Sequence, residues 1–226
     1  MLYIVATPIG NLKDLTLRAL EILKDVDYIV CEDTRRTRIL LKHHNINSPL
    51  ISFYEQNKKR RLPQIMKLLE EDKSIALVSD AGLPCIQDPG FLIVRECVRR
   101  DVKMSVIPGP ESIVSSLAIS GLPPSKFVFL GFLPHSGGKR RNLLKGALER
   151  FKDYTLIFFE SPYRLLKTLR DLEELASQRA VCVVKELTKI HEEVLRGNPG
   201  QLYEIFSSRK IKGEYVVLLG PQDYQI

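Results

Sequence analysis

Short apolar segments alternate with amphipathic segments along the first half of this 226-residue chain, and no other feature restricts its fold as much. The apolar segments are predicted strands, at residues 2–6, 27–31, 49–53, 74–79 and 103–107. The amphipathic segments are predicted helices, at residues 14–24, 34–43, 62–70 and 91–100. Strands that alternate with helices typically form a mostly parallel sheet with helices on both faces. The sequence therefore predicts an α/β fold.

The alternation breaks at residues 120–125, where one glycine and two prolines stand close together. Such a cluster is typical of a linker. We therefore predict an N-terminal α/β domain at 1–120, a linker at 121–126 and a C-terminal α/β domain at 127–226. The second domain has predicted strands at 127–132, 154–159, 180–186, 191–196 and 214–219. Its other predicted segments are a glycine-rich basic loop at 136–141, a helix from there to 150, and helices at 163–175 and 199–206.

Three loops rich in glycine and proline follow predicted strands of the first domain: TPIGN (7–11), SDAGLP (79–84) and PGPES (108–112). In open α/β sheets, ligands bind beyond the carboxyl ends of the strands. Glycine lets a backbone approach a ligand closely, and proline holds a loop in place. A single loop of this kind could simply turn the chain, but three at one sheet edge favour a ligand site.

Several motifs of other enzyme classes are missing from the chain. It contains no G-x-G-x-x-G, no P-loop and no G-x-S-x-G. Its four cysteines lie far apart without C-x-x-C spacing, so we expect reduced thiols and no metal site. The sequence also lacks a long apolar run and a signal-peptide pattern, so we expect a cytoplasmic protein with no membrane span.

The formal net charge of +7 favours polyanionic partners. The distribution of the basic residues is more informative than the total, because they cluster at 35–38, 58–61, 99–100 and 139–141. The pair at 99–100 ends a predicted helix, where cations suit the helix dipole. The other three clusters are candidate contacts for nucleic acid.

Eight short motifs follow one another along nearly the whole chain: TPIGNL (7–12), CEDTRRT (31–37), VSDAGLPCIQDPG (78–90), IPGPES (107–112), GFLP (131–134), FESPYR (159–164), KELTK (185–189) and KGEYVV (212–217). The ordered set resembles the ribosomal RNA small subunit methyltransferase I family of the tetrapyrrole-methylase superfamily. The resemblance implies two α/β domains with S-adenosylmethionine (SAM) in the cleft between them. It also implies a homodimer that methylates a cytidine 2′-hydroxyl in the decoding region of 16S ribosomal RNA. The substrate would be either the naked RNA or the assembled 30S particle.

Two other functions fit parts of this pattern. One is a SAM-dependent methylase of the same superfamily that acts on a tetrapyrrole or another small substrate. The other is an RNA-binding protein that has lost catalysis. The basic clusters and the TPIGN, ESPYR and KELTK motifs favour RNA as the substrate, and the intact glycine-proline loops argue against a loss of catalysis.

The resemblance assigns SAM binding to loops of the first domain and to strand ends of the second. The loop residues are Pro8, Asp80, Ala81, Gly82, Leu83, Pro84, Pro108, Gly109, Glu111 and Ser112. The strand-end residues are Phe132, Leu133, Glu160, Ser161, Glu186, Leu187, Glu214 and Tyr215. Two of them have simpler interpretations, because Asp80 could be a turn residue and Ser161 could start a helix at Pro162.

Methyl transfer to a ribose hydroxyl is an in-line displacement whose largest demand is alignment. A base or a cation beside the hydroxyl would assist the reaction. We predict Glu160 and Glu186 as catalytic carboxylates because they end strands that we expect to be neighbours. The alternatives left open are Glu32, Asp33, Lys185 and Lys189, with Asp33 also a candidate helix cap.

The family often has histidine at four positions where this chain does not. The replacements are Tyr163, Arg36, Tyr54 and Gln56. If the resemblance holds, catalysis here does not depend on an imidazole at those positions.

RNA binding is assigned to the basic clusters and to one arginine of the FESPYR motif. The predicted residues are Arg35, Arg36, Lys58, Lys59, Arg60, Lys139, Arg140, Arg141 and Arg164. Residues 58–61 follow two aromatic residues that could stack on bases, although a solvated helix start is an equal alternative. Residues 136–141 are predicted to be a mobile basic loop.

Overall fold

The computed structural model describes residues 1–225, which form two compact units, Met1–Glu111 and the chain from Ser112 onward. The boundary lies before α5 (Ile113–Ser120), a helix that we did not predict. This helix belongs to the second unit because its Leu117 lies in the core of that unit and the Ser120 carbonyl accepts a hydrogen bond from Arg196 Nε at 2.8 Å. The predicted linker at 121–126 therefore lies inside the second unit.

The first unit contains a parallel five-stranded sheet, as predicted. Its strands are β1 (Leu2–Val5), β2 (Tyr28–Cys31), β3 (Leu50–Ser52), β4 (Ile75–Leu77) and β5 (Met104–Ile107). They are ordered β3-β2-β4-β1-β5, and every neighbouring pair is parallel. Strand β1 therefore lies between β4 and β5, which places the loops after these three strands side by side.

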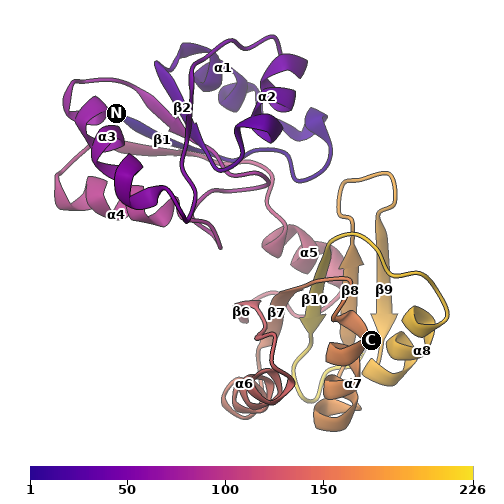
Figure 1. The fold of residues 1–226 in the computed structure, drawn as a ribbon. Helices are drawn as coiled ribbons and strands as arrows, with labels where there is room; N and C mark the ends of the chain where they lie inside the picture. Colours follow the sequence, from indigo (N-terminus) through magenta and orange to yellow (C-terminus); the bar gives the residue numbers. More distant parts are fainter. Residues whose placement is uncertain (226) are drawn as a thin grey trace. The chain divides into compact units, whose positions relative to one another are not determined.

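Helices cover both faces of this sheet (Figure 1). One face carries the short helix η1 (Leu12–Asp14) with α1 (Leu17–Asp25) and α2 (Thr34–His43), and the other carries α3 (Lys58–Glu70) and α4 (Phe91–Arg99). The start of α2 is fixed by Asp33, whose carboxylate accepts the Arg35 amide at 2.8 Å. Asp33 is thus an N-cap, the structural alternative that its position suggested.

The second unit contains a mixed five-stranded sheet. Its strands are β6 (Phe127–Phe132), β7 (Thr155–Glu160), β8 (Val181–Lys185), β9 (Glu193–Gly197) and β10 (Tyr215–Leu219). They are ordered β6-β7-β10-β8-β9, with only β6 and β7 parallel. The last strand lies between β7 and β8, so the prediction that Glu160 and Glu186 end neighbouring strands is wrong.

Three helices cover one face of this second sheet: α6 (Gly137–Arg150), α7 (Leu165–Ala176) and α8 (Pro199–Ser207).

The predicted loop at 136–141 is wrong, because α6 already begins at Gly137. The helix predicted from residue 62 likewise begins earlier, at Lys58 of α3. Within residues 1–225, no helix is long and apolar enough to span a membrane.

Candidate functional site

The loops after β1 and β4 are joined to each other by backbone hydrogen bonds. Thr7 and Gly82 form an antiparallel bridge, with N···O distances of 3.0 and 2.9 Å between their amides and carbonyls. The buried hydroxyl of Thr7 also donates to the Ser79 carbonyl at 3.1 Å. These bonds hold the TPIGN and SDAGLP loops together, as expected for loops of neighbouring strands.

The loop after β5 packs against the same pair. Gly82 has a φ of +83°, and a Cβ placed there would lie 3.3 Å from Ile9 and 3.7 Å from the backbone of Glu111. A Cβ on Gly109 would lie 3.1 Å from the Cβ of Ala6. A side chain would be strained by the positive φ at Gly82 and would press on Ala6 at Gly109, so the three loops form one close-packed edge, in which Gly82 is buried and Gly109 exposed.

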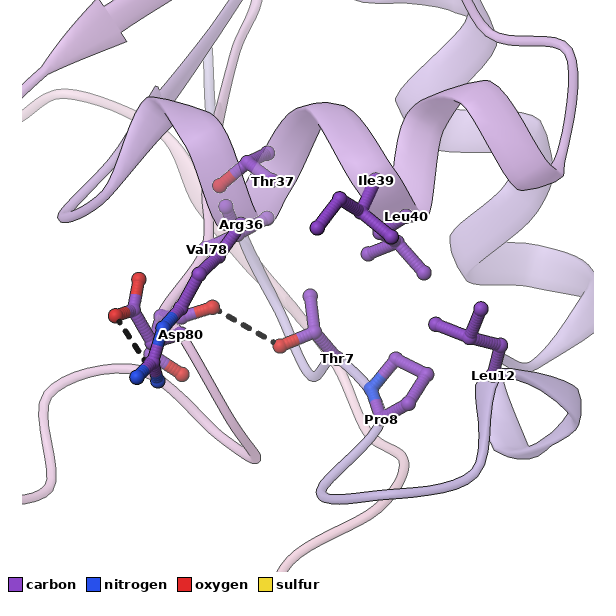
Figure 2. Close-up of a pocket in the computed structure, with 10 residues that line it drawn as sticks. Thr7, Pro8, Leu12, Arg36, Thr37, Ile39, Leu40, Val78 and Asp80 are labelled. Atoms are coloured by element: carbon purple, nitrogen blue, oxygen red, sulfur yellow. Dashed lines mark hydrogen bonds and ion pairs between the residues drawn. The ribbon is translucent and has the colours of Figure 1, made fainter.

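A cavity of about 130 Å³ lies beside this edge, within the first unit. Figure 2 shows Ile39 and Leu40 of α2 on one side of it and Pro8 and Leu12 on the other. Asp80 closes the polar end of the cavity. The cavity thus combines an apolar wall with a carboxylate and backbone groups.

Asp80 connects the second loop to α2. Its Oδ1 accepts the Asp33 amide at 3.1 Å, and its Oδ2 lies 3.5 Å from the guanidinium of Arg36. Asp80 therefore does more than turn the chain, because it positions the start of α2 against the loop. The Arg35 guanidinium and amide hold the pKa of Asp33 well below its ordinary value, whereas burial, followed by Asp80, raises the pKa of Glu32.

The remainder of the loop after β4 depends on Asp88, a residue that we did not single out. Its carboxylate accepts the amides of Cys85 at 2.8 Å and Gly90 at 2.7 Å. Cys85 and Gln87 both have positive φ angles, of 77° and 66°, which side chains adopt at a cost. Asp88 therefore stabilises a strained loop. The D-P-G triplet was the available signal, since aspartate commonly accepts amides of its own turn.

Four strand ends of the second unit lie at one edge of its sheet. Tyr215, the first residue of β10, pairs with Glu160 of β7 on one side and with Lys185 of β8 on the other. Leu133, just after β6, is joined to the same edge through Arg164, whose guanidinium donates to the Leu133 carbonyl at 2.7 Å. The predicted strand-end positions of this unit are therefore close together.

Glu160 does not have the surroundings of a catalytic carboxylate. Its side chain is fully buried, and its Oε1 accepts the Ser161 amide at 2.7 Å and pairs with Arg164 at 2.8 Å. Its Oε2 accepts the hydroxyl of Thr168 at 2.6 Å. Both oxygens are occupied inside the unit, which argues against the predicted catalytic role of Glu160.

Glu186 is more accessible and lies in a different ionic cluster. Its Oε1 accepts from Lys189 Nζ and from the Glu214 amide, both at 2.9 Å. Lys189 also pairs with the carboxylate of Glu214 at 2.9 Å. Burial opposes ionisation of Glu186, but the hydrogen bonds from Lys189 and the Glu214 amide outweigh it, so the pKa of Glu186 lies below its ordinary value.

Comparisons with known proteins give the family. A family model described as Tetrapyrrole (Corrin/Porphyrin) Methylases matches residues 1–203. The chain belongs to the tetrapyrrole methylase family. Ribosomal RNA small subunit methyltransferase I of Thermotoga maritima is 47% identical over 222 residues, which cover 98% of this chain and 99% of that protein. The protein of the same name from Hydrogenobaculum sp. is 43% identical, with 98% and 96% covered. These relatives place the chain among the ribosomal RNA small subunit methyltransferases I, as the motif order predicted.

Solved structures confirm the predicted fold class. A cobalt precorrin-4 methyltransferase aligns with a TM-score of 0.69 at 16% identity, over 97% of this chain and 94% of that one. A uroporphyrin-III-C-methyltransferase from Thermus thermophilus aligns with a TM-score of 0.64 at 17% identity, over 97% and 93%. At these identities the likeness shows the fold alone, which is the two-sheet α/β fold of the tetrapyrrole methylases.

Two arginines assigned to RNA binding are buried in this tetrapyrrole methylase. Arg164 is held by Glu160, the Leu133 carbonyl and the hydroxyl of Ser161. Arg140 is 4% exposed and pairs with the buried Asp171 at 2.7 Å. These two predictions are wrong because both guanidinium groups point into the second unit.

The other predicted RNA contacts lie on the surface. Lys59, Arg60 and Lys139 are exposed and form no ion pair among the described residues. The exposed Arg35, Arg36 and Arg141 pair with Asp33, Asp80 and Glu174, respectively, and the half-buried Lys58 pairs with Glu55. All seven residues stay predicted RNA contacts. Lys59, Arg60 and Lys139 can bind phosphates without first breaking an ion pair.

Proposed function

We propose that this protein transfers a methyl group from SAM to a cytidine 2′-hydroxyl in the decoding region of 16S ribosomal RNA. The observation that carries the proposal is the 47% identity to a ribosomal RNA small subunit methyltransferase I over almost the full length of both chains. The joined loops of the first unit and the cavity beside them support it. A ribosomal substrate also implies a cytoplasmic location.

The residues of the first unit fit SAM, which has an adenine at one end and charged groups at the other. Gly82 lets the loop after β4 adopt a positive φ and pair with Thr7, and the exposed Gly109 presents no side chain in the loop after β5. The apolar wall at Pro8 suits a ring, and Asp80 is held in place by its bonds to Asp33 and Arg36. When bound, SAM supplies a sulfonium-activated methyl group. We propose that the predicted loop residues hold it, with Pro84, Pro108 and Ser112 shaping the loops.

We propose further SAM contacts at the strand ends of the second unit, as the resemblance implied. Leu133 and Ser161 are fixed by Arg164, and Tyr215 is buried with its hydroxyl donating to the Lys212 carbonyl at 2.9 Å. Phe132 is 55% exposed and can contact a ligand. We keep Glu186 as the catalytic carboxylate because its side chain, unlike that of Glu160, is partly exposed. Its lowered pKa keeps it ionised but makes it a weaker base than an ordinary glutamate, so we propose that it orients the hydroxyl by accepting a hydrogen bond.

Transfer of tritium from methyl-labelled SAM tests the function. We expect label in the RNA of 30S particles or in naked 16S RNA, and 2′-O-methylcytidine after nuclease digestion. A uroporphyrinogen-type tetrapyrrole serves as the competing substrate. Label on the tetrapyrrole and none on RNA would overturn the proposal in favour of a small-molecule methylase. SAM binding without transfer to any of them would favour loss of catalysis.

We also propose that the protein is a homodimer, as its resemblance implied. Two large side chains of the second unit are almost fully exposed, Ile190 at 98% and Tyr163 at 90%, and a second copy would cover such groups. Light scattering is expected to give about twice the 25.8 kDa mass of one chain. A mass of one chain across the accessible concentration range would contradict the dimer.

A further inference from the structure

An open groove of about 680 Å³ lies along α2, separate from the cavity beside Asp80. One side is formed by Arg38 and Lys42, and the other by residues 45–50, which lead into β3. Its floor is Leu41, which is 4% exposed and belongs to the core of the first unit. The groove therefore has a rigid floor and a polar rim.

The groove is strongly cationic. Residues 34–54 contain four arginines and lysines and no aspartate or glutamate. Arg35 and Arg36 pair with Asp33 and Asp80, at the first turn of α2. Arg38 and Lys42 are exposed, and among the described residues neither forms an ion pair. Two uncompensated cations therefore face the groove.

The helix dipole does not account for Arg38. Arg38 lies in the middle of α2, away from its last turn, where the dipole acts. The last turn is already capped by backbone amides, because His44, Asn45 and Ile46 donate to carbonyls of α2 at 3.3, 3.2 and 2.8 Å. Lys42 lies in that last turn, where the dipole favours a cation, but among the described residues it forms no ion pair, so its ammonium group can still bind an external anion.

The opposite rim adds neutral hydrogen-bonding groups. Asn45 and Asn47 are exposed and line the groove. Asn45 has a φ of +53°, which asparagine tolerates better than most residues. An open groove lined by cations from α2 and by amides of residues 45–47 suits an extended polyanion. It does not suit a small apolar ligand, which would need an enclosed site.

We propose that this groove binds the sugar-phosphate backbone of the RNA substrate, with Arg38 and Lys42 on successive phosphates. The two residues stand one turn apart, about 6 Å along the helix axis. The inference rests on the proposed function and adds a substrate-binding surface to it. Arg36, Thr37 and Leu40 line the cavity from the same helix, so α2 fixes the distance between the groove and the candidate cofactor site.

The test is the salt dependence of RNA binding. The double variant Arg38→Gln, Lys42→Gln is compared with the wild type on a naked 16S RNA transcript and on 30S particles. Loss of two phosphate contacts should reduce the slope of log Kobs against log salt by about 1.4–1.8 and weaken binding roughly 10- to 30-fold near 0.15 M salt. The affinity for SAM should not change, because neither residue lines the cavity beside Asp80. The midpoint of unfolding should not change, because both side chains are exposed and, among the described residues, form no ion pair.

The matched control is Lys24→Gln, Lys103→Gln, which removes the same charge from exposed positions of the same unit. Its slope should equal that of the wild type. If both variants bind RNA like the wild type, or both lose the same affinity, the groove is not a specific contact and the inference is wrong. Weaker binding to 30S particles alone would assign the groove to a ribosomal protein and also overturn it. Wild-type protein that binds SAM but no RNA would refute the proposed function itself.

Discussion

Replacing Arg164 with methionine is expected to lower the free energy of unfolding by about 3–5 kcal/mol. The substitution leaves Glu160, whose side chain is fully buried, without its cationic partner. It also removes the hydrogen bond to the Leu133 carbonyl. Removing one member of a buried ion pair is costly because the remaining charge has lost its water without gaining a partner. Urea denaturation measures the change.

Lys167→Met, in the first turn of α7 just after Arg164, is the control. Lys167 is exposed, so the same loss of charge there should change the free energy of unfolding by about 0.5 kcal/mol or less. Thr168→Val provides an intermediate case, because it removes only the hydroxyl that donates to Glu160 and should cost about 1.5–3 kcal/mol. Equal stability of the Arg164 and Lys167 variants would show that the buried network does not stabilise the second unit.

Substituting Gly82 by alanine is expected to weaken SAM binding about 5- to 30-fold. At a φ of +83°, a side chain costs about 1–2 kcal/mol, and the new methyl group would lie 3.3 Å from Ile9. The loop relieves this strain by shifting, which disturbs the bridge between Gly82 and Thr7 that joins two of the three loops. Titration calorimetry of the variant with SAM measures the loss.

A second glycine-to-alanine variant controls for general effects of the added methyl group. Gly146 lies in α6, and a Cβ there would meet no atom within 4 Å. Gly146→Ala should keep the affinity for SAM and raise the free energy of unfolding by about 0.5–1 kcal/mol, because alanine favours a helix over glycine. Unchanged SAM affinity in the Gly82 variant would remove this loop from the cofactor site.

Local patterns in the sequence were sufficient to predict most of the first unit. Its strands and helices alternate, and each glycine-proline loop directly follows a strand. Because parallel strands present their carboxyl ends at one edge, the meeting of Thr7, Gly82 and Gly109 followed from the fold class alone. The capping role of Asp33 was equally local, since it depends on residues next to it in the chain.

The wrong predictions concern residues whose burial or strand neighbours depend on contacts with residues far away in the sequence. Arg140 stands between Lys139 and Arg141 in the sequence, yet it alone is buried, because Asp171 of α7 lies opposite it. Arg164 and Glu160 have the spacing of an ordinary surface ion pair, and only the packing of α7 reveals their burial. No local pattern indicated that β10 separates β7 from β8.

That central position of β10 has a consequence for biosynthesis. β7 and β8 are made well before residues 215–219, and until those residues emerge each has an unpaired edge towards the gap. Such edges pair readily with other chains, so the interval before the last strand arrives is the period of greatest aggregation risk for this unit. The second unit therefore folds late, after nearly all of its chain has been synthesised, whereas the first can complete its sheet once β5 is made.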